Sequence, residues 1–308
     1  MKISNKGLNL APFFVTIGAI SYGIPATIYN TAFKHGVTSG VLLCGMFLLG
    51  FIMFFVLVKI LANNHKILKI TKLKVIISGS SIALTNTFYM ISLIHTSVAV
   101  SAVLLMQSVW ISILIACFVN KTMPSLYQIC VVVCIIFGTI LATDLLNQNI
   151  KFSYLGAFLA LLSAITYAFT IQFTKNLALN LDPIVKAKFM CFGAFLTIFI
   201  IFIILNIFGF NSDLKNLDFK MLEKSFIFSL LAAFFSLIVP LVTFSYYMKK
   251  LRPGIGEIIT SVELPSAIFF AYVFLNQNVN LTQIIGVLII LISVVFANYE
   301  KKLKIKTF

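Results

Sequence analysis

Charged residues are scarce in this chain of 308 residues, since only 10% of them are Asp, Glu, Lys or Arg. A soluble domain carries about 25%. Hydrophobic residues make up 61%, and a soluble fold would have too few polar side chains to cover them. The charged residues lie between long apolar runs and not along each helix, which argues against a soluble helical domain. The sequence therefore predicts an integral membrane protein whose surroundings are a lipid bilayer.

Residues typical of metal, disulfide and nucleotide sites are also few. The five Cys residues lie inside apolar runs without any CxxC pair, so we interpret them as small packing residues. The three His residues are far apart, and no GxxxxGK[ST] phosphate-binding loop is present. We expect no metal, no cofactor and no ATP hydrolysis by the chain itself.

The apolar runs have the length of membrane-spanning helices. A helix needs about 20 residues to cross the hydrocarbon core. The first run is too long for the apolar core of a signal peptide, about 7–15 residues, and we interpret it as a span. The sequence predicts an all-α integral membrane protein with ten transmembrane helices, near 10–33, 37–60, 74–95, 97–119, 125–144, 154–175, 185–208, 225–248, 254–275 and 281–299.

The net charge of +15 comes from loop residues. If the amino terminus is cytoplasmic and the spans alternate, most of the 23 Lys and Arg residues fall on the cytoplasmic side, as the positive-inside rule requires. We interpret these residues as topology signals, and expect no nucleic acid partner. The predicted location is the cell (inner) membrane, as a multi-pass monomer or homodimer with both termini cytoplasmic.

Short patterns recur in the same order in both halves of the chain. "SYG" at 21–23 matches "TYA" at 166–168, "TF" at 87–88 recurs at 243–244, and Gln128 matches Gln283. These patterns predict two five-helix repeats, residues 1–148 and 149–308. Because five is odd, the second repeat would enter the membrane from the opposite side, which is the inverted arrangement of many secondary transporters.

The end of each half resembles a known family. Residues 262–298 form an apolar helix containing Pro265, a short loop, and a helix that opens with Gln283 and Gly286; residues 104–142 are a weaker copy that keeps Gln128 and Gly138. This pattern resembles the EamA family of the drug/metabolite transporter superfamily. The resemblance implies a transporter of amino acids, other metabolites or drugs, and not an enzyme.

Glu263 is the residue of greatest functional interest. It lies near the centre of the ninth predicted span, where a charge costs about 2.5–3.5 kcal/mol on insertion scales. We expect it to bind substrate or a proton, unless it is a structural Glu bonded to a neighbouring helix. Glu257 is a second candidate for proton coupling. Its alternative role is to cap its helix or to pair with Arg252 or Lys250.

Polar side chains of other spans are candidates for the substrate site. Gln107 is the repeat equivalent of Glu263 at an offset of 156 residues and shares a helix face with Trp110. The alternative is a packed Trp beside a bonded Gln. The other candidates lie on polar stripes of the first, third, sixth and eighth spans, where Ser and Thr could instead permit close helix packing; they are Tyr22, Asn86, Tyr89, Tyr167 and Thr243.

These observations favour a secondary transporter that moves a small organic metabolite, such as an amino acid or a related compound. It would work by alternating access, with proton coupling or exchange as the source of energy. A lipid flippase and an integral-membrane enzyme remain alternatives. We predict no catalytic residues, because only Glu257 and Glu263 among the eight acidic residues fall inside a span and not at its end, and neither has a His nearby in sequence.

Overall fold

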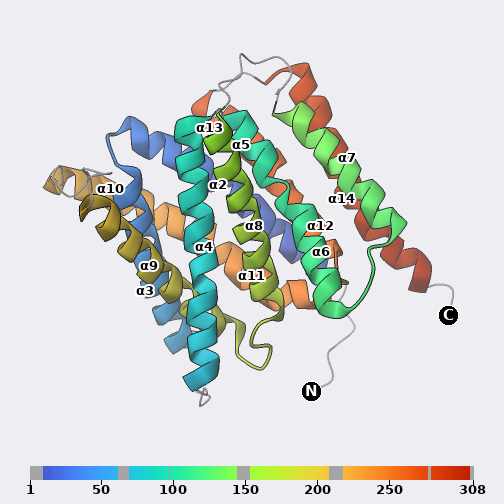
Figure 1. Cartoon of the computed structure of the whole chain (residues 1–308), viewed down its shortest axis with the longest axis horizontal. Coiled ribbons are helices and arrows are strands. Elements are labelled where there is room, and N and C mark those ends of the chain that lie inside the picture. Colours follow the sequence, from blue (N-terminus) through green and yellow to red (C-terminus); the bar gives the residue numbers. More distant parts are fainter. Residues whose placement is uncertain are drawn as a thin grey trace.

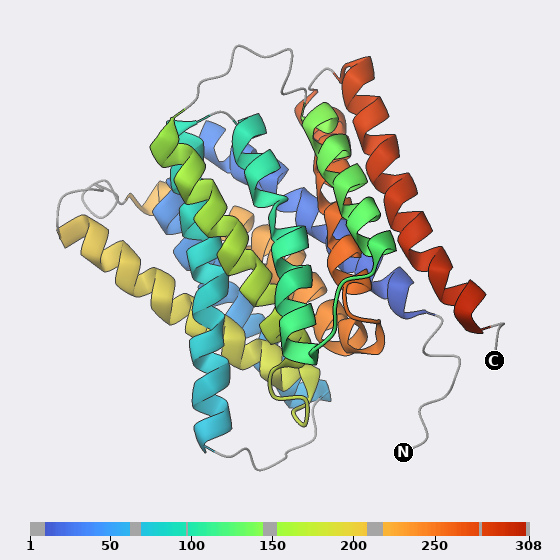
Figure 2. The ribbon, with the colours of Figure 1, turned by 45° about the vertical axis from the view of Figure 1, so that its right-hand side comes forward.

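The computed structural model describes residues 10–61, 69–96, 98–143, 153–207, 218–276 and 279–305, and the regular structure of these residues is helical throughout. The helices run side by side as a bundle (Figures 1 and 2). Residues 1–9 and 306–308 lie outside the described residues, as does the predicted repeat boundary at 148.

Each predicted apolar run coincides with a helix or with a broken helix. In the first half these elements are α2 (Ala11–Lys34), α3 (Ser39–Leu61), α4 (Lys69–His95), α5 (Val98–Leu105), α6 (Ser108–Asn120) and α7 (Leu126–Ala142). In the second half they are α8 (Tyr154–Asn176), α9 (Pro183–Ile207), α10 (Phe219–Ala233), η1 (Phe234–Ile238), α11 (Val239–Tyr247), η2 (Met248–Lys250), α12 (Ile255–Ile259), η3 (Thr260–Val262), α13 (Glu263–Leu275) and α14 (Leu281–Ile305).

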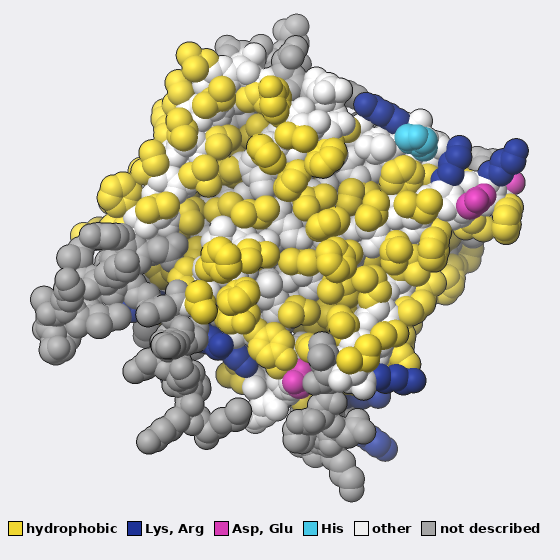
Figure 3. All heavy atoms as spheres, turned by 180° about the vertical axis from the view of Figure 1, so that it is seen from behind, with side chains coloured by type: hydrophobic (Ala, Val, Ile, Leu, Met, Phe, Trp, Pro, Cys, Tyr) yellow, Lys and Arg dark blue, Asp and Glu magenta, His cyan; other side chains and the backbone are white. Residues whose placement is uncertain are grey.

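Eight of these helical segments are long and apolar enough to cross a membrane. The remaining two of the ten predicted spans, α7 and the described part of α14, are shorter apolar helices. Hydrophobic side chains cover the middle of the molecular face in Figure 3, and most of the charged side chains lie toward its two ends. This distribution suits a protein whose belt contacts lipid tails while its ends contact water and headgroups.

Two apolar runs form helices that break near their middle. Between α12 and α13 the chain tightens into the 3-10 turn η3, because Pro265 has no N–H to donate to the carbonyl of Ser261. No proline marks the break between α5 and α6. There the Gln107 backbone N–H donates to the Leu104 carbonyl (3.1 Å), and the Gln107 side chain donates to the Val103 carbonyl (3.0 Å) that the break would leave free.

The eighth apolar run widens into the π-helical turn η1 just before Pro240. A proline inside a helix removes one backbone hydrogen bond and shifts its neighbours. The Ser21 hydroxyl of α2 donates to the Phe235 carbonyl within η1 (2.6 Å). The irregular backbone therefore keeps a partner, which the low-dielectric interior of a membrane protein requires.

The helices of the two halves interleave. α4 packs on α8 and α9, α2 packs on α11 and α13, and α3 packs on α9 and α10. α7 and α14 pack closely on each other at one side of the bundle (Figure 1). Glycine permits the closest approaches, since a Cβ atom at Gly193 would collide with the Ile76 carbonyl and one at Gly286 with the Ala142 backbone.

The glutamines that open α7 and α14 act as caps. The Gln128 side chain accepts a hydrogen bond from the Ser125 backbone N–H (3.1 Å), and its amide donates to the Pro253 carbonyl (2.8 Å). Gln283 accepts likewise from the Asn280 N–H (3.0 Å) and donates to the Ala142 carbonyl (3.3 Å). Each glutamine thus ends a loop and ties it to the opposite half of the chain.

Candidate functional site

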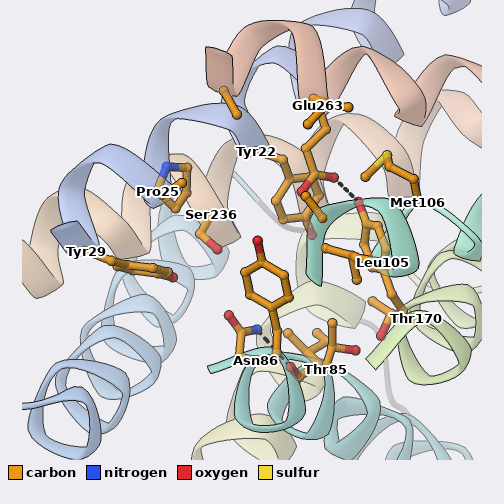
Figure 4. A pocket seen from close by; sticks show the side chains of 17 residues that line it. Tyr22, Pro25, Tyr29, Thr85, Asn86, Leu105, Met106, Thr170, Ser236 and Glu263 are labelled. Carbon is orange, nitrogen blue, oxygen red and sulfur yellow. Dashed lines mark hydrogen bonds between the residues drawn. The ribbon is translucent and has the colours of Figure 1, made fainter. Parts of the chain in front are cut away.

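A cavity lies in the middle of the bundle, between helices of both halves (Figure 4). Its volume is about 130 Å³, whereas one water needs about 10–15 Å³ in the same measure. A small organic molecule therefore fits. The lining is supplied by six elements and by the turn after α5: Tyr22, Pro25, Ala26 and Tyr29 of α2; Ile82, Thr85, Asn86 and Tyr89 of α4; Ala102, Leu105 and Met106; Tyr167 and Thr170 of α8; Ser236 of η1; Glu263, Leu264 and Ala267 of α13.

Glu263 is the charged residue of this lining. It is the first residue of α13, directly after the 3-10 turn, and it is half-buried. The Tyr167 hydroxyl donates a hydrogen bond to Glu263 Oε2 (2.8 Å), and the Tyr167 ring meets the Tyr22 ring edge to face, with centroids 5.9 Å apart. Figure 4 shows the carboxyl group beside Tyr22. The cavity thus contains one acid held by one hydroxyl and walled by aromatic rings.

The wall opposite Glu263 is polar and belongs to α4. Asn86 and Thr85 lie there, across the cavity from the carboxyl group (Figure 4). The Asn86 amide donates to the Ile82 carbonyl (2.9 Å), and the Thr85 hydroxyl lies within hydrogen-bond distance of the Ser81 carbonyl (2.7 Å). These bonds orient both side chains toward the cavity without help from a ligand.

Glu257 is fully buried and lies in a different environment from Glu263. Its Oε1 atom accepts from Lys175 Nζ (2.9 Å) and from Gln172 Nε2 (3.0 Å), and its Oε2 atom accepts from the Gly254 backbone N–H (3.0 Å). The predicted capping role is confirmed by the last of these bonds. The predicted pairing with Arg252 or Lys250 is wrong, because Lys175 of α8 is the partner.

The bonds around Glu257 connect three helices. Gln172 of α8 also donates to the carbonyl (2.8 Å) and hydroxyl (3.0 Å) of Ser112 in α6. Lys186, at the start of α9, donates to the Thr174 carbonyl at the end of α8 (2.6 Å). Lys175 and Lys186 are both buried, so these two lysines are structural partners in addition to any role in topology.

The structure brings together most of the predicted substrate-site residues. Tyr22, Asn86, Tyr89, Tyr167 and Glu263 all line the cavity. The polar stripes that contain these residues also hold helices together. Some stripe residues that do not line the cavity form hydrogen bonds to a neighbouring helix. Ser81 bonds to Thr170 (2.7 Å) and Ser163 to the Thr85 carbonyl (2.9 Å).

Three predicted residues lie outside the cavity lining. Trp110 donates to the Gln107 side chain (2.8 Å) and borders a separate apolar groove between α6 and α7. Thr243 bonds to the Val239 carbonyl of its own helix (2.8 Å) and contacts α2 at Gly18. A substrate-binding role for these residues stays a prediction.

Some lining residues were not singled out from the sequence as substrate-site candidates. Leu105 and Met106 reach the cavity because α5 ends there, and no proline or glycine marks that break. Ser236 belongs to the polar stripe of the eighth predicted span, and it reaches the cavity because the π turn before Pro240 lies against α2.

A comparison with family profiles matches residues 154–299 to the EamA-like transporter family. The matched residues are the second half of the chain. The match confirms the resemblance seen in the sequence, and it indicates a membrane transporter of the drug/metabolite type. The EamA-like segment contributes Tyr167, Thr170, Ser236 and Glu263 to the cavity.

The fold also recurs among solved structures. One, titled "Crystal structure of protein", is similar with a TM-score of 0.74 over 93% of this chain and 95% of its own. The sequences are 10% identical, so the similarity shows the fold alone. No curated protein matches this chain.

Proposed function

We propose that this chain is a secondary transporter that moves a small organic molecule, such as an amino acid or a related compound, across the cell (inner) membrane by alternating access. The observation that carries this proposal is the central cavity with Glu263 in its wall, lined by helices of both halves. Secondary transporters built from repeats place their site at such an interface, near broken helices. Both termini would lie in the cytoplasm.

We also propose that the two halves, 1–148 and 149–308, are inverted repeats. Packing is reciprocal under their exchange, since α4 packs on α8 as α11 packs on α2, and α6 packs on α8 as α13 packs on α2. The helix before each terminal loop ends in a left-handed residue, Lys121 with φ 52° and Asn276 with φ 50°. Each terminal helix then opens with a capping glutamine.

Glu263 would bind either the substrate or a proton. The titratable groups that interact with it electrostatically are Tyr22 of α2, Tyr89 of α4 and Tyr167 of α8. An unperturbed tyrosine titrates near pH 10, so Glu263 is the most acidic group of this cluster and the candidate to carry a proton. A carboxyl group that binds either a proton or the substrate, but not both at once, would couple proton movement to substrate movement.

The test is flux through purified protein in proteoliposomes. Vesicles loaded with an unlabelled metabolite extract are placed in the same extract labelled with ¹³C, and the compounds that enter are identified by mass spectrometry. We expect Glu263→Gln to reduce this exchange about 100-fold, the factor that corresponds to a lost interaction of about 3 kcal/mol with a charged group. Glu223→Gln, the same change at an exposed residue of α10, is the matched control. Absence of exchange by the unmodified protein would contradict the proposal.

A further inference from the structure

We propose that the ligand of the Glu263 cavity is an organic ammonium ion that carries no carboxylate. This inference rests on the proposed function and narrows its substrate class, since it excludes ordinary amino acids. Its first basis is charge. The lining includes one carboxyl group and, among the described residues, no Lys or Arg. Glu257, the other acidic residue of the same broken helix, is by contrast paired with Lys175 of the protein.

The second basis is the direction of the hydrogen bonds in the lining. The Tyr167 hydroxyl donates to Glu263, the Asn86 amide donates to Ile82, and the Thr170 hydroxyl donates to the Thr166 carbonyl (3.1 Å). The Thr85 hydroxyl lies 2.7 Å from the Ser81 carbonyl and 2.9 Å from the Thr166 hydroxyl. These hydroxyls and one N–H of the Asn86 amide are already used by the protein, whereas each oxygen keeps lone pairs. The second N–H of Asn86 and the hydroxyls of Tyr22 and Tyr89 are further donors of the lining, and all of them are neutral.

The consequence is a cavity that offers several acceptor oxygens and whose formal charge, among the described residues, comes from one carboxyl group. An ammonium group has three donors and no acceptor, so it matches the free oxygens of Glu263, Asn86 and Thr85. A carboxylate would find only neutral donors and no cation among the described lining residues, so its charge would stay unpaired beside that of Glu263. Burial of an unpaired charge is costly, so the arrangement selects against anions and zwitterions.

The third basis is the aromatic wall. Tyr22, Tyr29, Tyr89 and Tyr167 line the cavity together with aliphatic side chains. The face of an aromatic ring attracts a cation, by about 0.5–2 kcal/mol according to its desolvation. The aliphatic lining, which includes Leu105 and Leu264, suits an apolar body attached to the ammonium group.

The test uses four probes of similar size that differ in charge: phenethylamine, 2-phenylethanol, 3-phenylpropionate and phenylalanine. Binding to the detergent-solubilised protein is measured as the shift of the unfolding temperature, since a ligand that binds the folded state stabilises it. We expect phenethylamine to stabilise the unmodified protein and the other three to stabilise it less or not at all. In Glu263→Gln we expect the phenethylamine shift to vanish, while Glu263→Asp, which keeps the charge, and Glu223→Gln keep a shift.

Several outcomes overturn the proposal: no shift with phenethylamine, an equal or larger shift with 3-phenylpropionate or phenylalanine, or an unchanged phenethylamine shift in Glu263→Gln. If Glu263→Gln fails to fold, the order of the four probes on the unmodified protein still decides. The exchange assay with labelled metabolites tests the transporter function separately from the ammonium specificity. If neutral or acidic compounds exchange and phenethylamine does not bind, the transporter function stands and the ammonium class is wrong.

Discussion

Glu257 and Glu263 lie six residues apart on one broken helix, yet their carboxyl groups have very different hydrogen-bond partners. Glu257 accepts hydrogen bonds from a lysine, an amide side chain and a backbone N–H, and it has no contact with the cavity. Glu263 accepts from the hydroxyl of Tyr167 and lines the cavity. The hydrogen-bonding capacity of Glu257 is therefore satisfied within the protein, whereas Glu263 can still bind a proton or a ligand.

This difference teaches that depth in an apolar run does not by itself identify a functional acid. Both residues stand in the same predicted span, where a charge is expensive. Their partners distinguish them. A buried acid with a full set of donors holds helices together, whereas an acid with one neutral donor and an adjacent cavity is available for chemistry.

The largest expected effect is the loss of the cation beside Glu257. In Lys175→Met the Glu257 carboxylate stays buried without its counter-charge, which costs about 3–5 kcal/mol of unfolding free energy for pairs of this kind. Unfolding in mixed micelles of SDS and a mild detergent measures it. Lys224→Met, at an exposed lysine of α10, should change the unfolding free energy little.

A double variant sharpens this result. In Lys175→Met with Glu257→Met both charges are gone, and replacement of a buried ion pair by apolar residues is often close to neutral. We expect the double variant to recover most of the stability lost by Lys175→Met. If the unfolding free energy lost by the double variant equals the sum of the losses of Lys175→Met and Glu257→Met, the two residues do not act as a pair.

A smaller loss is expected at Tyr167, which among the described residues is the side chain that donates to the Glu263 carboxyl group. Tyr167→Phe removes a hydrogen bond to an acid, and such bonds contribute about 1.5–3 kcal/mol when the acceptor is charged. The same unfolding assay at pH 8 measures it, with Tyr272→Phe at an exposed position of α13 as the control. Equal losses in the two variants would contradict a specific role for the Tyr167 hydroxyl.

The smallest effect on stability is expected for Glu263→Gln. The amide keeps an acceptor for Tyr167 and removes a charge that has no counter-charge among the residues that the structure describes, so the unfolding free energy should change by less than about 1 kcal/mol. Glu257→Gln should lose clearly more, because Lys175 then becomes the uncompensated charge. A reversal of this order would mean that Glu263 is the structural acid.

The positions of the helices were predictable from the sequence because the bilayer imposes a length on each apolar run. Every predicted run coincides with helical structure, within a few residues at each end. The breaks were only partly predictable. Pro240 and Pro265 mark two of them, but the break after Leu105 depends on the side chain of Gln107, which nothing in the local sequence distinguishes from an ordinary helical glutamine.

The candidate site was partly predictable for a related reason. Glu263 and the tyrosines stand out because polar residues are rare in apolar runs. The partner of Glu257 was not predictable, since Lys175 is 82 residues away in sequence and twelve other Lys and Arg residues lie closer to Glu257 along the chain. Local spacing reveals a partner on the same helix and carries no information on a partner that tertiary packing supplies.

The three residues of η3, Thr260–Val262, are part of the five-residue segment between Glu257 and Glu263. A 3-10 turn rises about 2.0 Å per residue and rotates about 120°, against about 1.5 Å and 100° for an α-helix. If these residues relaxed to α geometry, the segment would shorten by about 1.5 Å and turn one carboxyl group by about 60° relative to the other. Glu257 is hydrogen-bonded to α8, so this change of helix geometry would rotate Glu263 about the helix axis. The geometry of η3 therefore determines the direction in which the Glu263 carboxyl group points.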